Sequence, residues 1–99
     1  MDYIQSINIK SIIMSLISEH IIPGPHGRVF GTDATEQKEL DCIKKRIFEL
    51  DGIKDVKLNT AVFPREITVY TTKLISVEDL EIQVKTTGFH AIPKDSFDL

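Results

Sequence analysis

The order in which strand-like and helix-like segments follow one another constrains the fold of this chain more than any other feature of the sequence. Strand-like segments cover residues 27–33, 53–58, 67–71 and 89–93. The alternation of side chains that is typical of a strand is clearest in 53–58 and 67–71. Segments with apolar residues three or four positions apart follow the first and the third of these, as expected for helices. The predicted order is therefore βαββαβ.

Both predicted helices have recognisable ends. The first is expected to use Thr35 as its N-cap and to stop at Asp51-Gly52. The second has a start that resembles a capping box, Ser76 with Asp79, and stops at Gly88. The apolar positions that these two helices are expected to bury are Leu40, Ile43, Ile47 and Leu50 in the first, and Val77, Leu80 and Val84 in the second.

This order of elements has a known geometric solution, because each βαβ half needs a right-handed crossover and the second half can place its strands beside the first. The predicted fold class is α+β: a ferredoxin-like βαββαβ sandwich, with a four-stranded antiparallel sheet and two crossover helices on one face. The other face of the sheet is left open.

An extra N-terminal amphipathic helix is predicted over residues 1–22, followed by a Pro-Gly-Pro turn. Its apolar stripe is formed by Ile9, Ile12, Ile13, Leu16 and Ile17. We expect this stripe to cover the open sheet face, within one chain or in a homodimer. The stripe is too short to span a bilayer and lacks the flanks of a signal peptide. The predicted organisation is an N-terminal helix and turn over 1–26, a domain over 27–95 and a tail over 96–99.

Composition narrows the classes of function and the compartment. Fifteen acidic and twelve basic residues give a net charge of −3, which argues against a nucleic-acid partner. The single cysteine, Cys42, cannot form an internal disulfide, and this favours a reducing cytoplasm. We expect a cytoplasmic protein.

Four segments together resemble a known family. Residues 50–59, 66–70, 76–80 and 87–91 are similar to the heavy-metal-associated (HMA) domain of copper chaperones and metal-transporting ATPases. The resemblance covers about residues 28–94 and implies the ferredoxin-like fold. It also implies a metal loop of the form Met-x-Cys-x-x-Cys, in which two thiolates bind a soft ion such as Cu(I) or Zn(II).

That metal loop is absent from this sequence. Counting back from Gly52 places Glu36 and Glu39 at the two cysteine positions, whereas counting forward from Gly31 places Ala34 and Gln37 there. Neither alignment supplies a thiol. Carboxylates prefer hard ions, so the metal specificity of the family does not carry over.

Four residues remain as candidate metal ligands: Asp33, Glu36, Glu39 and His90. The topology places the loop after the first strand and the loop before the last strand at the same end, so Asp33, Glu36 and His90 are expected to approach one another. A hard or borderline divalent metal ion could bind there. Alternatively, Glu36 and Glu39 complement the dipole of the first helix, and His90 is a partly exposed strand residue.

No enzyme chemistry is predicted. Residues 27–31 faintly resemble the first loop of acylphosphatases, but residues 32–37 lack the arginine that would hold a phosphate. Cys42 lies one residue off the apolar stripe, and we expect it to be a small packing group, with a reactive or chain-bridging thiol as the alternative.

The sequence therefore predicts a small, non-catalytic binding module with an HMA-like fold, no thiolate site, no required cofactor and a protein partner. Two alternatives stay open. The first is a metal-binding protein of heavy-metal transport or detoxification with carboxylate and histidine ligands. The second is a homo-oligomerisation unit that pairs through the N-terminal helix.

Overall fold

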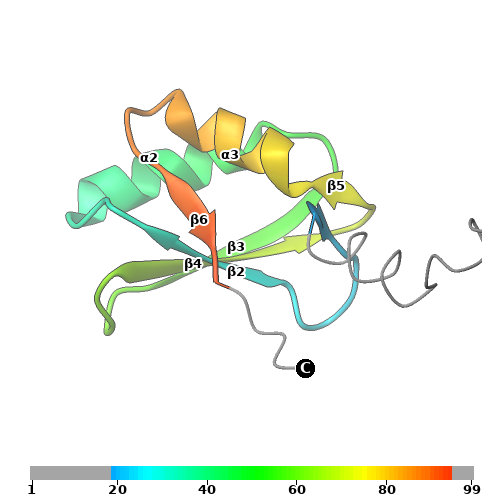
Figure 1. The fold of residues 1–99 in the computed structure, drawn as a ribbon, viewed down its shortest axis with the longest axis horizontal. Helices are drawn as coiled ribbons and strands as arrows, with labels where there is room; N and C mark the ends of the chain where they lie inside the picture. The colour runs from blue at the N-terminus through cyan, green and yellow to red at the C-terminus, as the bar shows by residue number, and fades with distance from the viewer. Residues whose placement is uncertain (1–18, 95–99) are drawn as a thin grey trace, which may run out of the picture.

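The computed structural model describes residues 19–94, so the predicted helical stripe over 9–17 and the tail over 96–99 lie outside it. The elements are β1 (His20–Ile21), β2 (Arg28–Thr32), α2 (Gln37–Phe48), β3 (Ile53–Asn59), β4 (Arg65–Thr71), β5 (Ile75–Ser76), α3 (Val77–Lys85) and β6 (Ala91–Pro93). Figure 1 shows α2 and α3 lying on one face of the sheet.

The main sheet has four antiparallel strands in the order β3-β4-β2-β6. With its two helices on one face, this arrangement confirms the predicted α+β, ferredoxin-like fold. The core lies between the sheet and the helices. It consists of fourteen buried apolar residues: Ile21, Phe30, Ala34, Leu40, Ile43, Ile47, Val56, Ile67, Val69, Ile75, Val77, Leu80, Val84 and Ala91.

The start of α2 differs from its prediction. The N-cap is Glu36 rather than Thr35, and the helix begins at Gln37. The carboxylate of Glu39 explains the shift, because it accepts hydrogen bonds from the backbone N–H groups of Thr35 and Glu36 at 3.0 and 3.1 Å. An acidic side chain three residues into the helix thus satisfies donors that a threonine cap would leave free.

The start of α3 agrees with its prediction. Ser76 is the N-cap, and its hydroxyl accepts a hydrogen bond from the backbone N–H of Asp79 at 3.1 Å. The last strand, however, is shorter than predicted, since it begins at Ala91 instead of Phe89. The backbone N–H groups of Phe89 and His90 instead donate to the side chains of Thr87 and Asp33, and the partly buried ring of Phe89 packs against the core.

The strand β3 forms one edge of the main sheet. Its pairing with β4 is irregular between Ile53 and Asp55. Just after this irregularity, the carboxylate of Asp55 accepts a hydrogen bond from the backbone N–H of Val56 at 2.8 Å. A side chain of the strand itself therefore occupies one of the strand's backbone donors.

The segment before the Pro-Gly-Pro turn corrects the sequence prediction. A helix was expected through residue 22, but His20 and Ile21 form strand β1, which pairs antiparallel with β5. Ile21 is 0% exposed. A β-branched residue suits a strand that must insert one side chain into an apolar core, and this burial outweighs continuation of the helix.

Candidate functional site

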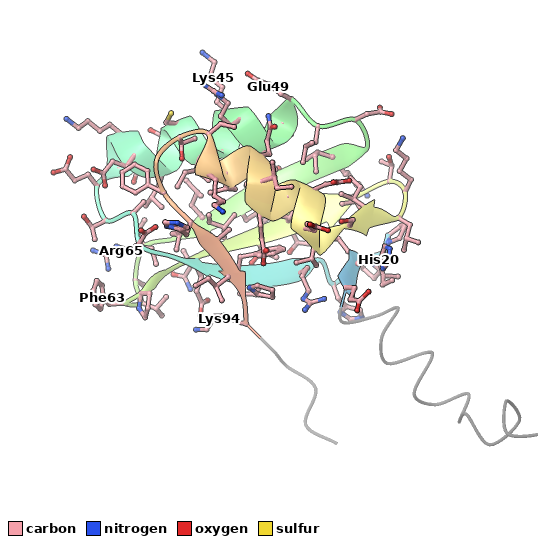
Figure 2. All side chains as sticks on the ribbon, turned by 45° about the horizontal axis from the view of Figure 1, so that its top comes forward. His20, Lys45, Glu49, Phe63, Arg65 and Lys94 are labelled. Atoms are coloured by element: carbon pink, nitrogen blue, oxygen red, sulfur yellow. The ribbon has the colours of Figure 1, made fainter. Side chains whose placement is uncertain are left out.

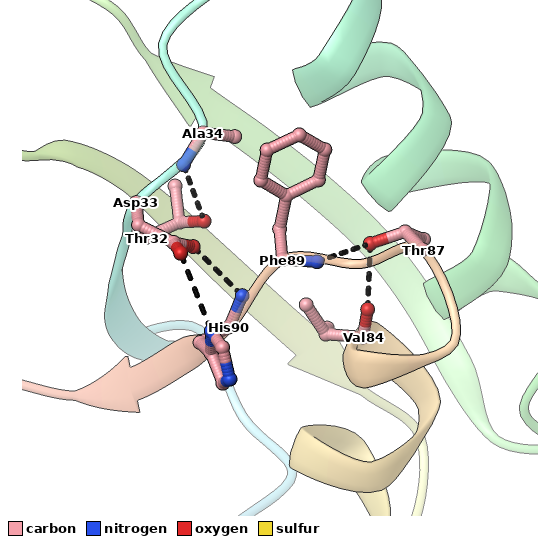
Figure 3. Close-up of polar contacts among 7 residues, drawn as sticks. All are labelled: Thr32, Asp33, Ala34, Val84, Thr87, Phe89 and His90. Carbon is pink, nitrogen blue, oxygen red and sulfur yellow. Dashed lines mark hydrogen bonds and ion pairs between the residues drawn. The ribbon is translucent and has the colours of Figure 1, made fainter.

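Two loops meet where the chain leaves β2 and where it enters β6. The backbone N–H of His90 donates to Oδ1 of Asp33 at 2.8 Å, and the imidazole Nδ1 of His90 lies 3.2 Å from Oδ2 of Asp33 (Figure 3). These residues are 57 positions apart in the sequence. Of the three residues predicted to approach one another, Asp33 and His90 are in contact, whereas the carboxylate of Glu36 pairs with Lys38.

Neighbouring hydroxyls hold both loops in place. The hydroxyl of Thr32 accepts a hydrogen bond from the backbone N–H of Ala34 at 3.2 Å. The hydroxyl of Thr87 donates to the carbonyl of Val84 at 2.6 Å and accepts from the backbone N–H of Phe89 at 3.3 Å (Figure 3). The Asp33–His90 contact is thus built on two locally fixed turns.

The electrostatics of this contact favour an ionised carboxylate. The backbone N–H of His90 is the largest cause that lowers the pKa of Asp33 below the ordinary value of 3.8. Slight burial acts in the opposite direction, and the imidazole of His90 lowers the pKa further. Hydrogen bonds to the charged form stabilise that form.

This lowered pKa predicts how the contact depends on pH. A carboxyl whose pKa is lower in the folded state stabilises the fold above its unfolded-state pKa and loses that contribution as pH falls through the folded-state value. Since Asp33 is largely exposed, we expect an effect on stability below about 1 kcal/mol. An NMR titration of the His90 backbone amide should move with a midpoint below 3.8, the ordinary pKa of Asp33. A midpoint above that value would contradict the described contact, and Asp33→Asn should abolish the transition.

The other two candidate ligands act at the start of α2. Hydrogen bonds from the backbone N–H groups of Glu36 and Thr35 lower the pKa of Glu39. Glu36 forms an ion pair with Lys38 at 3.7 Å. These contacts support the alternative in which both glutamates serve the helix. Within residues 19–94, no group of three or more His, Cys, Asp or Glu side chains is arranged to hold a metal ion.

Sequence reasoning missed an apolar groove beside this contact. It has a volume of about 540 Å³. Its walls are formed by Phe63 and Pro64 of the β3–β4 hairpin and by Ile92 of β6, and Phe63 and Ile92 are 77% and 66% exposed. Gly31, Thr32, Asp33, His90, Pro93 and Lys94 complete the lining. The only sequence signal was the Phe-Pro pair in the hairpin, which does not reveal that β6 lies opposite.

Cations near the groove are already engaged by the protein. Lys94 forms an ion pair with Glu66 at 2.6 Å. The guanidinium of Arg65 donates to the carbonyl of Val62 at 2.8 Å and lies 5.7 Å from the ring centroid of Phe63. In Figure 2, Phe63 and Arg65 lie at the end of the molecule opposite His20. The groove therefore offers mainly apolar contact.

Cys42 does not have the predicted packing role, because it is exposed on α2. Its position beside the apolar stripe turns the side chain to solvent. A single exposed thiol matches neither the paired thiolates of the HMA metal loop nor a buried packing group.

The arrangement of strands and helices matches two solved structures. A copper-binding domain from HMA7, a P-type ATPase, aligns with a TM-score of 0.57 at 14% identity, over 78% of this chain and 95% of that one. The apo HMA domain of a copper chaperone for superoxide dismutase also aligns with a TM-score of 0.57, at 23% identity, over 77% of this chain and 80% of that one. The chain has the fold of an HMA domain.

At these identities the likeness concerns the fold of the HMA-like domain. No protein-family model matches its sequence, and no curated protein matches it significantly. Within the part of the chain that the structure describes, no helix is long and apolar enough to cross a membrane.

Proposed function

We propose that the HMA-like domain is a non-catalytic docking module that binds a partner protein through the apolar groove between the β3–β4 hairpin and β6. The observation that carries this proposal is the exposure of Phe63 and Ile92 on the two sides of one groove. Exposed apolar side chains that gather around a hollow are typical of interaction sites. With one cysteine and a net charge of −3, the module suits a cytoplasmic protein partner better than a nucleic acid.

The chemistry of the groove specifies the kind of partner. Lys94 and Asp33 at its rim are already paired, with Glu66 and His90 respectively. A charged ligand would have to break these pairs, whereas an apolar side chain would bury Phe63 and Ile92 without cost to them. The occupant that fits is an aromatic or branched aliphatic side chain presented on a protein surface.

A double substitution in the groove tests this function. Phe63→Ser with Ile92→Ser should weaken binding of the purified partner by about 30-fold or more, because anchors in an interface often contribute about 2 kcal/mol. Parallel affinity capture with wild type and this variant would first identify proteins that depend on the groove. The dissociation constant of each purified candidate would then be measured by calorimetry.

The matched control is Ile82→Ser, since Ile82 is 54% exposed but lies on α3 and does not line the groove. It should bind the partner as the wild type does. If every specific partner bound the groove variant with unchanged affinity, the groove would not be the docking site. Circular dichroism should show that both variants retain the native fold.

A second candidate function is the binding of a divalent metal ion by Asp33 and His90. The observation that favours it is the pairing of a carboxylate with an imidazole in two locally fixed loops. These donors suit a hard or borderline ion such as Mn(II), Ni(II) or Zn(II) better than Cu(I). Two side chains would leave the remaining positions of such an ion to water.

Metal titration distinguishes the two functions. If docking is the function, we expect no saturable binding of Cu(I), Zn(II), Ni(II) or Mn(II) at micromolar concentration, because two exposed protein ligands are fewer than such sites normally use. Amide NMR shifts would be followed in the metal-free protein. Saturable shifts confined to residues 31–39 and 88–91, lost in His90→Ala and kept in Glu36→Ala, would instead establish metal binding at Asp33 and His90.

A further inference from the structure

The two-residue strand β1 is joined to the domain in an unusual way. Among residues 19–94 its one pairing partner is β5, in a two-stranded sheet separate from the four-stranded one (Figure 1). Nevertheless, the side chain of Ile21 is fully buried among core residues. The buried side chain of Ile21 and the backbone pairing with β5 therefore attach this short strand to the domain.

The connection from β1 to β2 contains two prolines and has open space beside Gly24. Pro23 and Pro25 restrict the backbone and disfavour helical conformation in the residue before each of them. A side chain built at Gly24 would meet nothing within 4 Å. At Gly27, by contrast, it would lie 2.9 Å from both the Tyr70 ring and the Val69 carbonyl, so here the chain is packed against β4. The connection thus bends at residues 24–26, between two points at which the chain is packed against the domain.

We propose that β1 is exchanged between two copies of this chain, so that Ile21 of each copy fills the socket of the other. The contacts of β1 would be the same in both forms. The pairing of His20 with Ser76 and the 3.3 Å hydrogen bond from the Arg28 guanidinium to the His20 carbonyl would re-form between copies. Exchange of an identical element is a low-cost route to a symmetric dimer.

Two exposed apolar side chains favour the exchanged form. Ile22 follows β1 and Leu74 precedes β5, and they are 42% and 47% exposed. In the exchanged dimer, two connections would lie side by side, and these side chains would gain apolar neighbours from the second copy. The second copy of this chain is therefore the partner that this end of the domain fits. This inference is independent of the proposed function, which concerns the opposite end.

Cross-linking of mixed single-cysteine variants tests the exchange. All proteins would carry Cys42→Ser, and one variant would add His20→Cys and another Ser76→Cys, because these residues are backbone partners. The two would be mixed at high concentration, incubated, diluted and oxidised with diamide. We expect a disulfide-linked dimer of one copy of each, at least about tenfold more abundant than in a control pair that combines His20→Cys with Lys45→Cys on α2.

Two further variants make the test decisive. A chain with both His20→Cys and Ser76→Cys should form an internal disulfide, which shows that loss of the Ser76 cap leaves the strand pair intact. Pro23→Gly with Pro25→Gly should lower the yield of cross-linked dimer several-fold, because a flexible connection favours return of β1 to its own chain. If the internal disulfide forms but the mixture gives no more dimer than the control pair, exchange does not occur.

Discussion

The Ile21→Ala variant is expected to have a free energy of unfolding about 2–5 kcal/mol lower than the wild type, the usual range for an aliphatic residue truncated in a packed core. Ile21 lies outside the four-stranded sheet but is 0% exposed. Urea denaturation followed by circular dichroism would measure the change. Stability of a small domain is only about 5–15 kcal/mol, so this single substitution should be conspicuous.

The neighbouring Ile22→Ala variant is the control for this prediction. The same chemical change at a half-exposed position should lower the free energy of unfolding by less than about 1 kcal/mol. Equal losses in both variants would contradict the burial of Ile21, and no loss in either would mean that β1 contributes nothing to the core. The comparison also shows whether residues before the Pro-Gly-Pro turn belong to the folded unit.

Gly27→Ala is the second substitution with a large expected effect. Gly27 has a φ of +69°, and a Cβ there would lie 2.9 Å from the backbone carbonyl of Val69 and 2.9 Å from the Tyr70 ring. The left-handed conformation alone costs a residue other than glycine about 1–2 kcal/mol. Because a backbone carbonyl cannot move as a flexible side chain can, we expect a total loss of about 2–4 kcal/mol, within the range of strained substitutions.

Gly88→Ala separates the cost of the left-handed backbone conformation from the cost of the steric contact. Gly88 also has a positive φ, +93°, but a Cβ there would meet nothing within 4 Å. Its loss of stability should therefore reflect backbone strain alone and be smaller than the loss for Gly27→Ala. Thermal or urea denaturation of both variants would provide the difference. If the two losses were equal, the close approach of the chain to β4 at Gly27, just before β2, would not be a source of destabilisation.

The main elements of this fold could be predicted because their periodic patterns and end signals agree. Leu40, Ile43 and Ile47 repeat at helical spacing, and the structure buries all three. Ser76 has an acidic residue three positions later, and it caps α3 as expected. Where the local pattern and the tertiary packing favour the same conformation, a single sequence is sufficient to predict that conformation.

The prediction failed where tertiary packing overrides a local pattern. Ile21 continues the apolar character of the preceding segment, so nothing in the sequence separates a helix end from a two-residue strand. Thr35 has the stronger capping preference. In the structure, however, the carboxylate of Glu39 accepts hydrogen bonds from the backbone N–H groups of Thr35 and Glu36, and the helix begins one residue later than predicted. Pro23 and Pro25 indicate a boundary, yet Ile21, two residues before Pro23, enters the core.

Only part of the candidate site could be predicted from the sequence, because the groove depends on tertiary packing. Asp33 and His90 could be brought together from topology alone, because both lie in loops at one end of the sheet. The groove depends instead on Phe63 and Ile92, which no periodic pattern relates to each other. A hollow between a hairpin and an edge strand depends on how the two lie in space, which a sequence pattern does not report.

The hydrogen bond from the Val56 amide to the Asp55 carboxylate in β3 bears on how this protein behaves at high concentration. An edge strand of seven residues could template the addition of strands from other molecules and start fibrillar aggregation. The carboxylate of Asp55 occupies the Val56 amide, and Lys54 and Lys57 place positive charge beside it. Charged side chains on an edge strand disfavour the addition of another strand, so we expect Lys54, Asp55 and Lys57 to oppose such addition at β3.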